Sequence, residues 1–173
     1  MDESHDRNGL YQSITHGQLK IEEVITFIKS FLEEDSKAEY SLVIGTDSHE
    51  KSGPKNGTKT ISLVTAILVH RKGTGGKYFW KRFTITNIHS LREKIYAETM
   101  GSLDFASTFV PLLKKHLNGK MPEYNLEIHI DVGEHGDTRD MIKEVVGMVT
   151  GNGYVAKTKP EAYGASYVAD KHT

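Results

Sequence analysis

The sequence contains no cysteine and no long apolar run. The lack of cysteine excludes disulfides, thiolate metal sites and a cysteine nucleophile. No segment approaches the eighteen or more consecutive apolar residues that a membrane-spanning helix needs. The first twenty residues also lack the apolar stretch of a signal peptide. We therefore expect a cytoplasmic protein that does not act in a membrane.

The composition that remains is typical of one globular domain. Hydrophobic residues make up 37% and charged residues 26% of the 173 residues, with only four prolines. A chain of this length can bury one sizeable core but is too short for two ordinary domains. We expect a polar N-terminal segment over residues 1–17 and a single domain over residues 18–173.

The pattern of apolar residues predicts an α/β fold. Residues 18–34 carry apolar side chains at three- and four-residue spacing, which indicates a helix. Strand-like segments rich in β-branched residues follow at 40–47, 60–70 and 77–86, and Gly73–Gly76 indicates a hairpin turn between the last two. The rest of the chain alternates: helix 90–117, strand 126–131, helix 137–149, strand 154–158 and a helix after 160. This order predicts a mixed five-stranded sheet, with three antiparallel strands and then parallel strands, helices on both faces and an additional N-terminal helix.

Two predicted strands end in an aspartate. Asp47 ends the first strand and Asp131 ends the strand at 126–131. A cap of a turn or helix is the structural alternative for either residue. Because the carboxyl ends of parallel strands meet at one edge of an open sheet, we expect the two carboxylates to lie close together.

Two further acids are candidates for the same site. Glu98 lies about 60° from the centre of the apolar stripe of its predicted helix, near the buried face. A buried carboxylate needs a base, a hydrogen-bond donor or a metal as its partner. A side chain that packs its stem and extends its head into solvent is the alternative. Asp170 is the fourth candidate, with fraying near the end of the chain as the alternative.

Several carboxylates in one place repel one another unless a cation neutralises them. Oxygen ligands without cysteine favour Mg²⁺ or Mn²⁺ over zinc. Such ions can activate a water and stabilise the leaving oxygen of a phosphodiester. The site residues that we predict to be both catalytic and metal-binding are Asp47, Glu98, Asp131 and Asp170. Ser48, His49 and His135 lie beside these acids and are candidates for proton relay or substrate contact.

The segment from residue 51 to residue 82 is basic and contains no acid. Its positive residues are Lys51, Lys55, Lys59, Arg71, Lys72, Lys77, Lys81 and Arg82, in a chain whose net charge is only −1. A basic region of this kind can hold a nucleic-acid backbone. A surface that only adds solubility is the alternative.

Five motifs together resemble a known family. They are GTDSH, IYAE, IDVGEHGDTRDMI, GMVTGNGY and KPEAYGASYVAD, which begin at residues 45, 95, 130, 147 and 159. With the element order, they resemble the YkuK-like family of predicted ribonuclease H-related proteins, in the ribonuclease H-like superfamily, from about Gln18 onward. The resemblance implies a metal site formed by Asp47, Glu98 and Asp131. It also implies that Asp170 matches the acid that opens the last helix of ribonuclease H-like enzymes.

Three functions are compatible with these observations. The first is a divalent-metal-dependent nuclease that hydrolyses phosphodiester bonds in RNA, RNA–DNA hybrid or structured DNA. The second is a non-catalytic module that binds nucleic acid through the same fold. The third is a nucleotide phosphohydrolase, since Gly45–Ser48 is similar to the phosphate-binding turn of actin-like ATPases. Fold resemblance alone does not choose among them, and homo-oligomerisation stays open.

Overall fold

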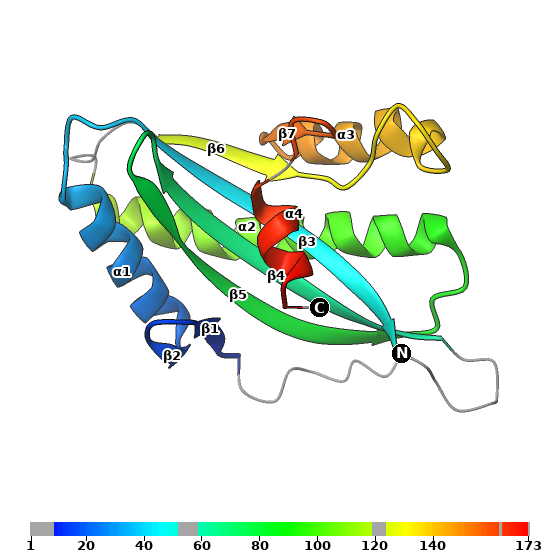
Figure 1. Ribbon diagram of the computed structural model, residues 1–173, viewed down its shortest axis with the longest axis horizontal. Helices are drawn as coiled ribbons and strands as arrows, with labels where there is room; N and C mark the ends of the chain where they lie inside the picture. Colours follow the sequence, from blue (N-terminus) through cyan, green and yellow to red (C-terminus); the bar gives the residue numbers. More distant parts are fainter. Residues whose placement is uncertain (1–8, 52–58, 119–123, 163, 173) are drawn as a thin grey trace.

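The computed structural model describes residues 9–51, 59–118, 124–162 and 164–172. The elements follow the predicted order of helices and strands (Figure 1). They are β1 (Tyr11–Ser13), β2 (Gly17–Leu19), α1 (Ile21–Glu33), β3 (Tyr40–Lys51), β4 (Thr60–Arg71), β5 (Gly75–Thr86), α2 (Leu91–Leu117), β6 (Tyr124–His129), the 3₁₀ turn η1 (Arg139–Met141), α3 (Ile142–Gly151), β7 (Val155–Lys157) and α4 (Gly164–Asp170).

The strands form one mixed sheet in the order β2-β1-β5-β4-β3-β6-β7. Strands β3, β4 and β5 are antiparallel, whereas β6 and β7 are parallel to β3. This confirms the predicted α/β class. The predicted strand count of five is too low, because β1 and β2 form a hairpin that pairs with β5 through Gln12 and Trp80. Strands of three residues are too short to give a clear alternating pattern in the sequence.

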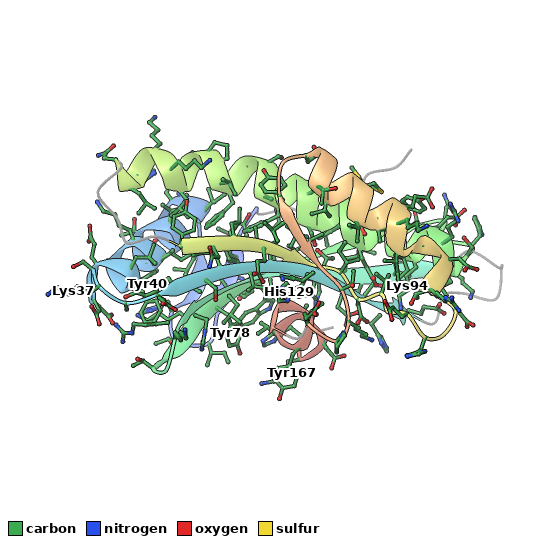
Figure 2. All side chains as sticks on the ribbon, turned by 90° about the horizontal axis from the view of Figure 1, so that it is seen from above. Lys37, Tyr40, Tyr78, Lys94, His129 and Tyr167 are labelled. Atoms are coloured by element: carbon green, nitrogen blue, oxygen red, sulfur yellow. The ribbon has the colours of Figure 1, made fainter. Side chains whose placement is uncertain are left out.

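Helices cover both faces of the sheet, as predicted. Figure 2 shows α2 and α3 on one side of the sheet and the short helix α4 on the other. Helix α1 packs on the same face as α2, where Phe27 stacks on Phe79 of β5. Most of the buried apolar side chains belong to this layer, while a second cluster joins Val64 and Ala66 of β4 to Val168 and Ala169 of α4. Among the described residues, no helix is both long and apolar enough to cross a membrane.

Helix α2 is the long helix that crosses one face of the sheet over its central strands (Figure 2). It begins where the Ser90 hydroxyl accepts a hydrogen bond from the Glu93 backbone N–H at 3.1 Å. It ends at Leu117, and the following residue Asn118 has a left-handed backbone conformation. At Gly101, a Cβ atom would lie only 3.0 Å from the Phe83 ring and 3.3 Å from Thr46. Glycine therefore permits α2 to approach β3 and β5 closely at this point.

Strand β3 is longer than predicted, and this changes the position of Asp47. Strand β4 pairs with β3 along its whole length, from Tyr40 to Lys51, whereas β6 pairs with it only as far as Gly45. Asp47 therefore lies inside β3, two residues beyond the part that β6 covers, and does not end the strand. Asp131 likewise follows β6 by two residues, because β6 ends at His129.

Candidate carboxylate site

Asp47 lies on the face of the sheet that α4 covers. It is directly opposite Val64 of β4, and residues opposite each other on antiparallel strands share a face. Val64 packs against Val168 and Ala169 of α4. Asp170, the next residue of α4, follows this apolar contact directly, so that the helix positions it near the end of β3.

The neighbours of Asp47 point to the opposite face, toward α2, because side chains alternate along a strand. The Thr46 hydroxyl lies 2.8 Å from that of Thr65 and 2.9 Å from that of Ser102, and all three side chains are buried. The Ser48 hydroxyl donates a hydrogen bond of 2.6 Å to Glu98 Oε1. A layer of hydroxyl groups therefore joins β3 to α2 and fixes the carboxylate of Glu98 beside the strand.

Glu98 is almost completely buried, with 4% of its surface exposed. The pKa of Glu98 is raised to about 7. Burial is the largest cause, and the negative charges of Asp47 and Asp131 act in the same direction, while the Ser48 hydrogen bond and the charge of Lys94 oppose the shift. Near pH 7 this carboxyl group is therefore shared between its neutral and ionised forms. The predicted position of Glu98 near the buried face of its helix is confirmed.

Asp47 is half-buried and has a perturbed pKa as well. Burial is the largest cause of its raised pKa, and the carboxylates of Asp131 and Asp170 raise it further, while a backbone hydrogen bond at Ser48 and the charge of Lys94 oppose the shift. The acids that act on Asp47 come from the loop after β6 and from α4. Negative charge from separate elements is thus concentrated at the end of β3.

Asp131 has a cationic partner of its own. The Lys159 ammonium Nζ lies 2.7 Å from Asp131 Oδ1. The side chain of Asp131 is 32% exposed and that of Lys159 is 58% exposed, so that this ion pair lies at the surface. The sequence did not indicate Lys159, which is 28 positions away from Asp131.

Asp170 is exposed at the end of α4, and His172 after it is held against the sheet. The His172 ring stacks on Trp80 at a centroid distance of 3.7 Å and an interplanar angle of 7°. Its Nε2 atom lies 3.4 Å from the Tyr78 hydroxyl, and Arg82 donates a hydrogen bond to the His172 backbone carbonyl. These contacts to β5 oppose fraying after Asp170.

The four predicted acids do not form a compact set of metal ligands. Within the part of the chain that the structure describes, no three His, Cys, Asp or Glu side chains lie close enough to hold one ion. Asp47 lies on the α4 face of β3, whereas Glu98 reaches the strand from the α2 face. Mg²⁺ commonly binds only one or two carboxylates and completes its shell with water and substrate phosphates. The oxygen donors present fit a metal held in that way.

Comparison with known proteins places the fold in a family. A family model described as Ribonuclease H-like matches residues 23–173. The chain belongs to the ribonuclease H-like family. It is 34% identical over 175 residues to the "Uncharacterized protein YkuK" of Bacillus subtilis (strain 168), with 95% of this chain and 96% of that protein covered. This similarity confirms the YkuK-like resemblance. No solved structure matches the chain significantly.

Membership of the ribonuclease H-like family supports a function in nucleic-acid cleavage or binding in general terms. Divalent metals are often used by this fold, which agrees with the type of acid found here. The family does not define the reaction, because one fold can carry several chemistries. A more specific proposal for the reaction must therefore rest on the charged residues around Asp47.

The residues predicted for proton relay lie in different surroundings. Ser48 is buried and bonded to Glu98. His49 is exposed two residues after Asp47, and His135 is exposed in the loop between β6 and η1. Ser48 can act only through Glu98, while the two histidine rings are accessible to a substrate.

Within the described parts of this ribonuclease H-like chain, the basic residues do not form one patch around the acids. Arg71, Lys72 and Lys77 lie near the tip of the β4–β5 hairpin, at the Tyr40 end of β3, which is about 24 Å along the strand from Asp47. Asp47 pairs with Val64 of β4, and Val64 pairs with Arg82 of β5. Two strand spacings, about 10 Å, therefore separate the backbone positions of Asp47 and Arg82.

Several of these bases already have acidic partners. The ion pairs are Lys59 with Glu50 at 3.6 Å, Arg71 with Glu34 at 3.3 Å and Lys72 with Glu39 at 2.8 Å. The ammonium of Lys81 lies over the ring of Tyr11 and that of Lys77 over the ring of Phe31. Lys55 and the side chain of Lys51 lie outside the described residues.

Sequence reasoning missed two lysines, Lys94 and Lys159. Lys94 lies one helical turn before Glu98 in α2, and its charge lowers the pKa of both Glu98 and Asp47. Figure 2 shows it at the end of the sheet opposite Tyr40. The four-residue spacing from Glu98 is a signal that could have indicated Lys94. No local pattern could have indicated Lys159, because its contact with Asp131 arises from tertiary structure.

Proposed function

We propose that this protein is a Mg²⁺- or Mn²⁺-dependent nuclease that hydrolyses phosphodiester bonds in RNA, RNA–DNA hybrid or structured DNA. The observation that supports this most directly is the perturbed Asp47. Its pKa is raised by burial and by two carboxylates that come from other elements, Asp131 and Asp170. Groups with a perturbed pKa gather at functional sites, and a divalent cation would relieve the mutual repulsion of these acids.

The chain's own residues have separate tasks in this proposal. Asp47, on the central strand β3, would hold the cation together with Asp131, and Asp170 and Glu98 would complete the negative charge around it. A bound divalent ion lowers the pKa of a water and stabilises the leaving oxygen. Because the pKa of Glu98 is about 7, a fraction of the protein molecules carries a protonated Glu98 at neutral pH. In those molecules the proton must leave before Glu98 can act as a charged ligand. Ser48 keeps the carboxyl group of Glu98 in one orientation.

The substrate backbone is held by basic side chains outside the acids. The residues proposed for this contact are Lys51, Lys55, Lys59, Arg71, Lys72, Lys77, Lys81 and Arg82. Of these, Arg82 is in register with Asp47 across the sheet. The exposed rings of His49 and His135 are proposed to contact substrate or to relay a proton.

A specific observation favours the alternative of a non-catalytic nucleic-acid-binding module. Asp131 is already paired with Lys159, and the described residues contain no group of three potential ligands for one ion. A protein of this kind would bind nucleic acid with a salt-dependent affinity that EDTA does not change.

Substitution of Asp47 tests the nuclease. We expect Asp47→Asn to lower metal-dependent cleavage of hybrid, RNA or branched substrates by more than about 100-fold, since even loss of an outer-shell partner of a metal costs 10- to 100-fold. Its thermal stability without metal should be unchanged or higher, because one of several repelling charges is removed. Calorimetric titration of Mn²⁺ and Mg²⁺, with and without a short hybrid duplex, should show binding to the wild type alone.

The matched control is Asp104→Asn, at an exposed acid of α2 on the surface. It should cleave and bind metal as the wild type does. If Asp47→Asn unfolds in the absence of metal, Asp47 is structural and the proposed role is wrong. If the wild type binds nucleic acid but neither metal nor EDTA has any effect, the non-catalytic module is the correct alternative.

A further inference from the structure

The backbone of the loop after β7 places Lys159 beside Asp131. The Ile130 N–H donates to the Lys157 carbonyl at 2.9 Å, and the Lys159 N–H donates to the Val132 carbonyl at 2.8 Å. These two bonds extend the parallel pairing of β6 and β7 beyond the ends of both strands. Asp131 and Lys159 therefore face each other because of fixed main-chain geometry, and not only because two long side chains meet by chance.

Gly133 leaves the space that Lys159 occupies. A Cβ atom at Gly133 would lie 3.3 Å from the Lys159 Cβ and 3.8 Å from its Cδ. Any larger residue at position 133 would crowd the stem of the lysine. The loop after β6 is thus shaped to accept Lys159 next to the candidate site.

The ion pair itself adds little stability, because both side chains are partly exposed and solvent screens such pairs. Its electrostatic position is more informative. The charge of Asp131 raises the pKa of both Asp47 and Glu98, so that Asp131 belongs to the repelling group of acids. Lys159 supplies this group with a positive charge on a flexible stem, at the carboxylate that a metal would need.

We propose that Lys159 is an exchangeable counterion: it neutralises Asp131 in the metal-free protein, and it leaves Asp131 for a backbone phosphate when a divalent cation and nucleic acid bind. This inference rests on the proposed function. A cation at Asp131 repels the lysine ammonium, and a phosphate that arrives beside the cation attracts it. Lysine is suited to this exchange, since its ammonium is a point charge with three donors and no fixed orientation.

Metal titration tests the first half of the proposal. Binding of Mn²⁺ to chelator-treated wild type, Lys159→Met and Lys37→Met is measured by calorimetric titration. Lys37→Met is the control, because it removes the same charge from an exposed residue at the far end of the sheet (Figure 2). Lys159→Met should bind Mn²⁺ about two- to fivefold more tightly than the wild type, as expected when an exposed ion pair no longer competes. Lys37→Met should match the wild type.

Salt dependence tests the second half. Binding of a 2′-O-methyl RNA–DNA hybrid is measured over a range of salt concentrations, once with Mn²⁺ and once with EDTA. With Mn²⁺, the slope of log affinity against log salt should be smaller by about 0.9 in Lys159→Met than in the wild type, the value for one lost phosphate contact. With EDTA the two slopes should agree, because Lys159 then stays on Asp131.

The outcomes separate this inference from the proposed function. Equal Mn²⁺ affinity in wild type and Lys159→Met would overturn the counterion role while leaving a metal-dependent nuclease intact. An unchanged salt slope with Mn²⁺ would overturn the contact with phosphate. A complete lack of Mn²⁺ binding in all three proteins, with and without the hybrid, would overturn the inference and the proposed function together.

Discussion

The two ends of β3, Tyr40 at its start and the last part of the strand from Asp47 to Lys51, differ in how their polar groups are paired. At the first end, the Tyr40 hydroxyl lies 3.1 Å from the carbonyl oxygens of both Phe31 and Asp35, near the C-terminal end of α1. The Phe31 carbonyl belongs to the last turn of α1, where partners within the helix are lacking, and Asp35 follows the helix. The nearby bases Arg71 and Lys72 have acidic partners.

At the Asp47 end, Asp131 is paired with Lys159, but the acids still repel one another. Asp47 and Glu98 both have a raised pKa, and each is affected by further carboxylates. The same strand thus stabilises the fold at one end and concentrates unfavourable charge at the other. Local conflicts of this kind are expected at functional sites, where the rest of the structure compensates for them.

The largest effect on stability is expected for Glu98→Gln, which removes a buried ionisable group from the Asp47 end of β3. The folded protein holds the Glu98 proton up to about pH 7, whereas the ordinary pKa is 4.5. Stability from this group is therefore fully present below about pH 4.5 and is lost as the pH rises to about 7. Between pH 5 and pH 8 the free energy of unfolding should fall by about 2–3 kcal/mol more in the wild type than in Glu98→Gln, as follows from 1.36 kcal/mol per pKa unit.

Urea unfolding of chelator-treated protein at pH 5, 6, 7 and 8 measures this difference. Asp104→Asn, at an exposed carboxylate of the same helix, should follow the wild type at every pH. Parallel pH dependence in wild type and Glu98→Gln would mean that Glu98 is ionised in the folded state throughout, and that the end of β3 at Asp47 is not strained by its burial.

A smaller effect is expected at the opposite end of the strand. Tyr40→Phe should lower the free energy of unfolding by about 1 kcal/mol, because the carbonyls of Phe31 and Asp35 lose the Tyr40 hydroxyl as their hydrogen-bond partner. The proposed nuclease activity and metal affinity should be unchanged. Denaturant unfolding beside Tyr167→Phe, at a ring that is 62% exposed, provides the control. A loss of metal binding in Tyr40→Phe would show that the two ends are coupled.

The smallest effect should come from the ion pair between Lys72 and Glu39. Both side chains are 76% exposed, and solvent screens such pairs strongly. We expect Lys72→Met to leave the urea midpoint unchanged within error, while hybrid binding weakens only if this residue contacts the backbone. A clear drop in the midpoint would show that the ion pair at this end is more than a surface contact.

The long elements could be predicted closely from the sequence. The predicted strand 60–70 became β4, Thr60–Arg71, and the predicted helix 90–117 became α2, Leu91–Leu117. Their apolar patterns extend over many residues and agree with their tertiary environment. The hairpin β1–β2 was missed because each strand has three residues, and the end of β3 was misplaced because its pairing with β4 continues after its pairing with β6 has ended.

The candidate site was predictable in its residues but not in its geometry. The sequence by itself determined the α/β class, the kinds of acid and the position of Glu98 near the buried face of its helix, because helix and strand periodicity assign side chains to faces. Only the tertiary structure decided that Glu98 bonds to Ser48 on one face, that Asp47 lies on the other, and that Lys159 pairs with Asp131. Charge–charge distances and desolvation depend on segments far apart in the chain, and for this reason no local pattern encodes them.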